Sequence, residues 1–193
     1  MRPLAVIAAL AVVAAAGFLL WPRAGGRASS PCGPTESTPA ELGLNEAGTV
    51  TICLLNRERA SHGLQPLAQN ALLGQAALLH SRDMVTRAYF EHTSPDGQTV
   101  QDRIRATGYG GGGSASTGEN IEWAIGRKAT PAAIVDKWMH SPPHRADILR
   151  RTFTEIGVGI ALGAPALNGQ AKGAGATYTT DFGGVFDPSL SSG

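Results

Sequence analysis

The chain has 193 residues, which suits one domain with its own core and a terminal extension. Its formal net charge is +1, and Arg150-Arg151 is the one place where two arginines are adjacent. These totals exclude the broad basic surface that nucleic-acid-binding proteins use, so we expect no nucleic-acid partner.

The N-terminus predicts export. Residues Leu4 to Trp21 carry no charge and stop at Pro22-Arg23. A spanning helix needs about 17–25 apolar residues, whereas the apolar part of a cleaved signal has about 7–15. The run therefore favours an uncleaved membrane anchor over residues 1–22, and a signal peptide cleaved near Ala28 is the alternative. In both cases the domain lies outside the cytoplasm, and it contacts a membrane only through this segment.

Residues 23–39 are rich in Gly, Ser, Pro and Thr and are interpreted as a flexible linker. The domain is expected at 40–187, followed by a tail at 188–193. Exported proteins rarely keep exposed free thiols, so we favour a bridge between Cys32 and Cys53 over two free cysteines.

Helical spacing of apolar residues predicts helices at 50–61, 71–87 and 100–107. The expected buried stripe of the second helix consists of Leu72, Ala76, Leu79 and Val85.

Two more helices are predicted to start at Thr130-Pro131 and Ser141-Pro142, because an N-cap residue precedes a proline in each. The second should end near Arg150. Alternating residues then predict strands at 156–160 and 178–182, joined by a Gly- and Ala-rich loop from about 162 to 175. Helices followed by mostly antiparallel strands indicate an α+β sandwich.

His144 would occupy the third position of the helix that starts after Ser141. The partial positive charge of a helix N-terminus disfavours imidazolium, and a neutral imidazole suits a metal ligand or a general base. A surface histidine beside a helix start is the ordinary alternative.

Three further residues are candidates with ordinary alternatives. His92 lies in a loop before the turn at Pro95, Glu119 follows a glycine-rich run, and Glu155 precedes a strand. Each is equally explained as a polar loop or strand-end residue. No pair has tight metal-ligand spacing and no Gly-x-Ser-x-Gly occurs, so catalytic residues stay undetermined.

Four pieces, YFEHTSPDG, GENI, WMHSPPHR and TEIGVGI, occur in this order and are followed by YTTDFGG. As an ordered set they resemble the CAP superfamily, also called the SCP domain, in its bacterial branch. The resemblance implies a three-layer α-β-α sandwich with a central, mostly antiparallel sheet. It also implies a shallow cleft lined by two His and two Glu, which in some members hold a divalent metal such as zinc.

The resemblance assigns the cleft positions to His92, Glu119 and His144. The remaining Glu would lie three residues after the Trp, where this chain has Ser141, and Glu155 is our substitute. The implied metal ligands are His92, His144 and Glu119, for zinc or another divalent cation.

The favoured function is an exported binding module whose His/Glu cleft binds a divalent metal and an extracellular ligand of unknown identity, of the lipid or cell-envelope class. One alternative is a hydrolase that depends on the His/Glu residues with or without metal. The other is a carrier of sterols or fatty acids. The incomplete tetrad and the lack of a nucleophile favour binding, and enzymatic activity is left open.

Overall fold

The structure, a computed structural model, describes residues 31–111, 115–165 and 175–185. The predicted anchor at 1–22, the tail at 188–193 and most of the loop expected at 162–175 lie outside the described residues. Within the described ranges, no helix combines the length and hydropathy needed to cross a membrane.

The described residues form helices and strands that largely follow the predicted order. The α-helices are α1 (Pro39–Leu42), α2 (Leu44–Ser61), α3 (Ala71–Arg87), α4 (Val100–Ala106), α5 (Pro131–Met139) and α6 (Pro142–Ile148). The strands are β1 (Ala68–Gln69), β2 (Ala115–Ile125), β3 (Glu155–Leu162) and β4 (Gly175–Val185), and a 3-10 helix, η1, spans Gly126–Ala129. The α3 bounds match the prediction, whereas β1 and β2 were not predicted.

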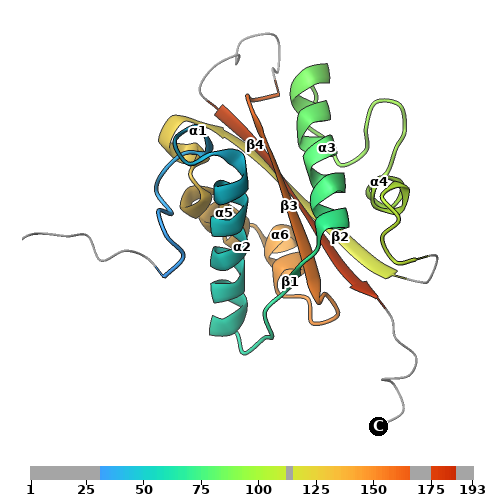
Figure 1. Cartoon of the computed structure of the whole chain (residues 1–193), viewed down its shortest axis with the longest axis horizontal. Coiled ribbons are helices and arrows are strands. Elements are labelled where there is room, and N and C mark those ends of the chain that lie inside the picture. Colours follow the sequence, from blue (N-terminus) through green and yellow to red (C-terminus); the bar gives the residue numbers. More distant parts are fainter. Residues whose placement is uncertain (1–30, 112–114, 166–174, 186–193) are drawn as a thin grey trace, which may run out of the picture.

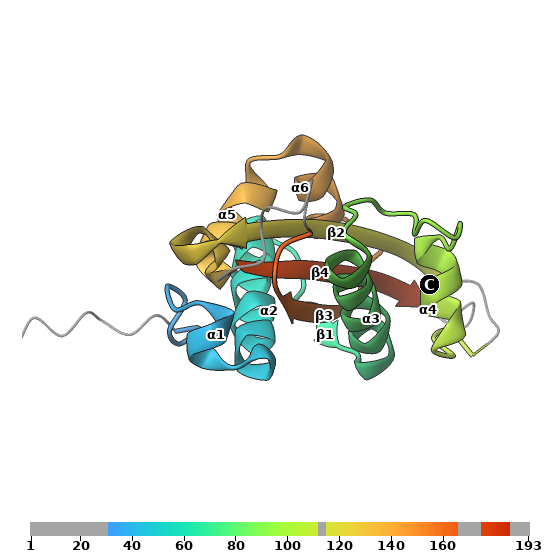
Figure 2. The same cartoon turned by 90° about the horizontal axis from the view of Figure 1, so that it is seen from above.

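The four strands form one sheet in the order β1-β3-β4-β2. β4 pairs antiparallel with both β2 and β3, and the short β1 pairs parallel with β3. In Figures 1 and 2, α3 and α4 lie on one side of the sheet, while α2 and α5 lie on the other. The predicted three-layer α+β sandwich is confirmed, with a mixed sheet in which β1 is the parallel exception.

The larger apolar core lies between the sheet and the α2–α5 layer. Trp138 of α5 is fully buried and meets Tyr178 of β4 edge to face, with ring centroids 6.5 Å apart. Phe153 stacks on Phe182 with centroids 5.5 Å apart. Aromatic pairs at such distances add to the stability that their buried area provides.

On the other face, α3 packs directly against the backbone of β3. A Cβ placed on Gly157 would lie 2.0 Å from the backbone N of Gly74, and one on Gly159 would lie 2.0 Å from that of Leu78. This close approach changes which side of α3 is buried. The predicted stripe is wrong at Leu72 and Leu79, whose side chains are 37% and 54% exposed, and is confirmed at Ala76, which is buried. The buried residues of α3 are Leu73, Ala76, Ala77, His80, Ser81 and Met84.

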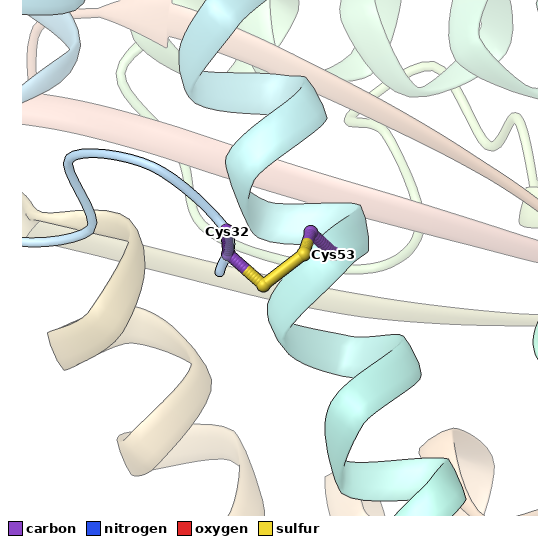
Figure 3. Close-up of a disulfide and its surroundings, with 2 residues drawn as sticks. All are labelled: Cys32 and Cys53. Carbon is purple, nitrogen blue, oxygen red and sulfur yellow. A yellow bond between two sulfur atoms is a disulfide. The ribbon is translucent and has the colours of Figure 1, made fainter. Parts of the chain in front are cut away.

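The predicted disulfide is confirmed. Cys32 is bonded to Cys53 of α2, with their Cα atoms 5.5 Å apart (Figure 3). Cys32 belongs to residues 31–38, the described part of the expected linker that precedes α1. The backbone N–H of Ala132 also donates to the Thr35 carbonyl at 3.1 Å. Residues 31–38 are thus tied to α2 through the disulfide and to α5 through this hydrogen bond.

Candidate functional site

The candidate residues gather around β2, which lies at one end of the described sheet order. Glu119 is paired with Asp181 of β4, and the next residue, Asn120, is paired with Thr180. Successive side chains of a strand point to opposite faces. Glu119 accordingly contacts residues of α3 and α4, whereas Asn120 contacts α6. We call His92, Glu119, Arg103 and His144, which surround β2 on its two faces, the edge-strand site.

A short hydrogen bond joins His92 to Glu119. His92 Nδ1 lies 2.7 Å from Glu119 Oε1; the histidine side chain is 51% exposed and the glutamate side chain 1%. An ionised carboxylate only accepts hydrogen bonds, so Nδ1 carries the proton and Nε2 is the accepting nitrogen of the neutral ring. The bond to Glu119 raises the pKa of His92, although partial burial of the ring opposes this.

Glu119 is held from its other side by Arg103 of α4. The guanidinium donates to Glu119 Oε2 at 2.8 Å, to the His92 carbonyl at 2.8 Å and to the Gln98 carbonyl at 3.1 Å. Its side chain is 7% exposed. Burial by itself would raise the pKa of Glu119, but the bond from His92 and the charges of His80 and Arg103 lower it overall. Glu119 is therefore a buried, ionised carboxylate.

Asp181 lies beside Glu119 on β4 and is fully buried. Neither of its carboxyl oxygens has a hydrogen-bond partner among the described residues. Burial, followed by the nearby Glu119 charge, raises the pKa of Asp181 well above its ordinary value. Asp181 therefore holds its proton to a higher pH than an exposed aspartate, since two close carboxylates in a buried place disfavour each other's ionisation.

His144 stands on the other face, at the third position of α6 as predicted, with Ser141 as the N-cap. Asn120 Nδ2 donates to the His144 carbonyl at 3.0 Å, which fixes the start of α6 on β2. Burial lowers the pKa of His144, while the charge of Glu122 raises it and that of His92 lowers it. The ring is neutral, and its electrostatic partners come from both the β2 strand and the His92 loop.

The glycine of the GENI segment has a packing role. A Cβ on Gly118 would lie 2.8 Å from the ring of Phe153. Phe153 thus covers this part of β2 directly. Any larger residue at 118 would displace the ring and the strand that carries Glu119.

Glu155 does not join these residues. Its carboxylate accepts from Asn70 Nδ2 at 2.8 Å and from the Tyr109 hydroxyl at 2.7 Å. β4 lies between its strand and β2, and the register offsets the two residues by two positions, so Glu155 is about 12 Å from Glu119 along the sheet. Its contacts join β3 to the turn that follows α4 and to the start of α3.

The donor set does not fit a bound metal as arranged. Across the described ranges, no group of three or more His, Cys, Asp or Glu side chains is placed to hold a metal ion. Both Glu119 oxygens are engaged, one by the protonated Nδ1 of His92 and one by Arg103. Glu119 therefore has no unengaged oxygen for a metal and the Arg103 guanidinium repels a second cation, so Nε2 is the nitrogen of His92 that could still bind one. Zinc or another divalent cation at His92, His144 and Glu119 stays a prediction that these contacts do not favour.

A cavity of about 530 Å³ lies between α3 and α4. His80, Ser94 and Arg103 are among the residues that line it. Arg103 therefore forms part of the wall of this cavity.

Comparison with known sequences gives the family. A sequence profile described as CAP, the cysteine-rich secretory protein family, matches residues 53–170, more than half of the chain. The chain belongs to this family. Among its relatives, the uncharacterized Bacillus subtilis protein YkwD is 38% identical over 125 residues, which is 65% of this chain and 46% of YkwD. The Bacillus subtilis membrane protein YlbC, also uncharacterized, is 35% identical over 107 residues, 55% of this chain and 29% of YlbC.

Solved structures agree with this assignment. An extracellular SCP-domain protein from Bacillus anthracis superposes with a TM-score of 0.59 and 29% identity, over 76% of this chain and 43% of that protein. An outer surface protein of Borrelia burgdorferi gives a TM-score of 0.58 at 18% identity, over 71% of this chain and 91% of its own. The latter similarity shows the fold alone. The matched region spans less than half of YkwD, YlbC and the Bacillus anthracis protein.

Several residues in or beside the edge-strand site were not selected as site residues from the sequence. His80 of α3 is fully buried; its Nε2 donates to the Glu91 carbonyl at 3.1 Å and lies 3.7 Å from Glu119 Oε1. Glu122 of β2 lies 2.8 Å from Lys137 and acts electrostatically on His144. Arg103 and Asp181 carried no signal at all, because a lone arginine in a short helix and an aspartate within a strand have many ordinary roles.

Proposed function

We propose that this chain is an exported CAP domain that binds an extracellular ligand at the edge-strand site. The observation that carries the proposal is the His92–Glu119 bond. A buried carboxylate fixes the orientation of a half-exposed imidazole and leaves Nε2 as an acceptor. Ordering a side chain before binding reduces the entropy lost when a ligand arrives.

Export is supported by three independent features. The N-terminal run from Leu4 to Trp21 has the composition of an export segment, and the Cys32–Cys53 bridge suits an oxidising compartment. The Bacillus anthracis relative is described as extracellular.

The chemistry of the site indicates the kind of ligand. His144 has a neutral ring, the Nε2 of His92 is not used by the bond to Glu119, and the surrounding side chains are polar or charged. Such groups suit a ligand rich in hydroxyl and amide donors. A cell-envelope component of that chemistry fits this site better than a sterol or a fatty acid.

A second function is favoured by the same bond. A buried carboxylate that orients a histidine, with Nε2 free, is the arrangement of a general base that activates water or a hydroxyl. Hydrolysis of an envelope ester or amide is therefore our alternative proposal, with His92 as the base and Glu119 as its orienting partner.

Ligand titration followed by amide NMR tests the first proposal. The probe is a set of soluble muropeptides, which carry N-acetyl sugars and peptide amides. We expect shift changes at residues 92, 119 and 144 in the wild type. His92→Gln should weaken binding at least tenfold. His140→Gln, whose side chain is 78% exposed on the neighbouring turn, should bind like the wild type. Equal binding by wild type and His92→Gln would overturn the proposal.

The alternative is tested with the same three proteins and a chromogenic ester. General-base catalysis contributes roughly 10²- to 10⁴-fold in rate. A hydrolase should thus lose at least a hundredfold of its activity in His92→Gln and none in His140→Gln. Ester hydrolysis that is equal in all three proteins would remove this alternative.

A further inference from the structure

We propose that the outer edge of β3 is a docking groove for an extended peptide that ends in an acidic residue. The groove lies at the β1-β3 end of the sheet order, whereas the edge-strand site lies at the β2 end. The inference therefore goes beyond the proposed function and does not depend on the ligand that binds there.

Most of β3 has no partner strand on its outer side. β4 pairs with β3 along its whole length, but β1 pairs only with Glu155 and Ile156. Beyond Ile156, no strand of the described residues covers this side. The Ile156 carbonyl accepts from the Asn70 N–H on the β1 side, and the backbone groups of alternate residues point the same way. The N–H and C=O groups of Val158 and Ile160 therefore form an open edge, on which another chain can pair.

This open edge lies in a groove between two helices. The groove has a volume of about 410 Å³, and Val158, Gly159 and Ile160 of β3 line it together with residues of α2 and α3. Figures 1 and 2 show α2 and α3 on either side of β3. The volume lies in the range of about 300–1,000 Å³ that is typical of ligand sites. A few residues of a single chain fit here, while the two helices keep the sheet of a second molecule away.

Two glycines inside the helices keep the groove open. Gly48 of α2 and Gly74 of α3 both line it. Glycine is a poor helix former, and neither residue has the positive φ that would require one. A Cβ on Gly74 would meet nothing within 4 Å, and a Cβ on Gly48 would meet only the Val158 carbonyl, at 3.9 Å. Side chains at these positions would thus fill the groove without disturbing the fold, and glycine is typical of places where a ligand approaches the backbone closely.

The charge of the groove indicates the chemistry of the peptide. Arg82 of α3 is the one charged residue among the described residues that line it. The neutral polar residues of the lining are Asn45, Thr49, Gln69, Asn70 and Gln75. Arg82 is exposed and makes no hydrogen bond or ion pair with another described residue. Its guanidinium is therefore available to a carboxylate, which it can bind through two parallel hydrogen bonds.

The direction of α3 places Arg82 at one end of the groove. A Cβ on Gly157 would meet Gly74, and one on Gly159 would meet Leu78, so α3 runs in the same direction as β3. Arg82 follows Leu78 by about one helical turn and lies beyond Gly159. A peptide that pairs parallel to β3, as β1 does, ends beside Arg82. Its backbone would pair with the edge, and its terminal carboxylates would bind the guanidinium.

The test is a titration of the purified chain with two peptide pools, followed by amide NMR. One pool contains acetylated pentapeptides with Val, Ile, Thr or Tyr at the first four positions and Glu with a free carboxylate at the last. These four residue types favour extended strands. The other pool ends in Lys with an amidated terminus. The acidic pool should shift the amides of Val158 and Ile160 and slow hydrogen exchange at Val158 at least tenfold, whereas the basic pool should do neither.

Three variants test the two parts of the groove. Arg82→Glu should weaken binding of the acidic pool at least fivefold. Arg57→Glu is the matched control, because Arg57 is an exposed arginine of α2 that does not line the groove. Gly74→Leu should abolish binding by filling the groove, while its unfolding midpoint stays at or above that of the wild type. Gly74→Gln replaces it should the leucine variant not fold.

The inference is overturned if the wild type binds neither pool, if it binds both equally, or if a folded Gly74→Leu binds the acidic pool as tightly as the wild type. Protection of the Val158 amide before any peptide is added would also overturn it. Loss of that protection on dilution would assign the edge to a second copy of the chain, and loss on removal of residues 1–30 would assign it to the N-terminal segment. Muropeptide binding is measured separately through His92, so failure of one site leaves the other unaffected.

Discussion

Breaking the Cys32–Cys53 bridge gives a prediction whose magnitude follows from the topology. The two cysteines are 21 residues apart in sequence. The chain-entropy treatment of a cross-link of this length gives a loss of about 3.3 kcal/mol in the free energy of unfolding. For a chain of this size the midpoint of thermal unfolding should fall by about 7–13 °C.

The loss should be the same for Cys32→Ser, for Cys53→Ser and for the double variant, because each removes the same cross-link. Urea unfolding of the oxidised chain, the reduced chain and the three variants measures it. The reduced wild type should match the double variant. Hydrogen exchange should then quicken mainly in residues 31–38, since α2 keeps its contacts with β3 and α5.

Two results would contradict this reasoning. One is a double variant whose loss in the free energy of unfolding equals the sum of the two single losses. This would mean that the packing of each side chain matters more than the cross-link. A total loss below about 1 kcal/mol would mean that the Ala132–Thr35 hydrogen bond and neighbouring contacts already fix the segment, so that the loop-entropy estimate does not apply.

Two further predictions concern the sheet. Gly159→Ala should destabilise the domain by about 3 kcal/mol or more, because its Cβ would lie 2.0 Å from α3 backbone. The matched control is Gly74→Ala, whose Cβ meets nothing within 4 Å and should gain up to about 1 kcal/mol from helix propensity. Thermal unfolding of both variants tests this prediction. A Gly159→Ala variant with the same unfolding midpoint as the wild type would contradict the direct helix–strand contact. Asp181→Asn should stabilise the domain at neutral pH: the folded-state pKa of Asp181 lies above the unfolded value of about 3.9, so wild-type stability falls as pH rises from about 4 through the folded pKa. Urea unfolding from pH 4 to 8 should show that the free energy of unfolding of Asp181→Asn exceeds that of the wild type by an amount that grows with pH. A difference that does not depend on pH would mean that Asp181 is ionised in the fold.

Helix boundaries could be predicted where local chemistry decides them. Thr130 and Ser141, each followed by proline, mark the starts of α5 and α6. The Thr130 hydroxyl caps α5 as expected, since it accepts from the Ala133 N–H. α2 begins earlier than predicted, at Leu44, with Gly43 at a positive φ of 86° as its N-cap. That glycine marks a boundary by its backbone conformation, which an apolar pattern does not encode.

The buried face of α3 could not be predicted from its own residues. The periodic pattern selected Leu72 and Leu79, yet the helix turns a face of small and polar residues to the sheet. The reason lies about 80 residues further along the chain, where Gly157 and Gly159 remove the side chains that would separate helix and strand. Burial here follows from close backbone approach, so hydrophobicity alone gives the wrong face.

β2 was not predicted from the sequence, for a different reason. Its sequence, ASTGENIEWAI, lacks the alternation of apolar residues that marks a strand, and several of its polar residues are buried. Motif reading nevertheless selected Glu119 within it, because an acidic residue between turn formers and an apolar run is a recognisable local feature. Arg103 and Asp181 act through partners distant in sequence, so no local pattern reveals them.

The polar residues of β2, together with its place at the end of the sheet order, explain why this strand carries the site. A strand at the end of the sheet order can be contacted from both faces, here by α4 and by α6. Glu119 and Asn120 therefore reach opposite faces from adjacent positions, one orienting His92 and the other fixing the start of the helix that carries His144. A central strand covered by apolar layers would have to bury these groups without outlet to solvent, at a far higher cost. The stability that the polar strand does not supply comes from elsewhere: β4 pairs with β2 along its full length, and the core around Trp138 and Tyr178 packs beneath it. The fold thus separates the residues that stabilise the sheet from the half-exposed His92 that faces solvent, which is why His92→Gln is expected to alter binding before it alters folding.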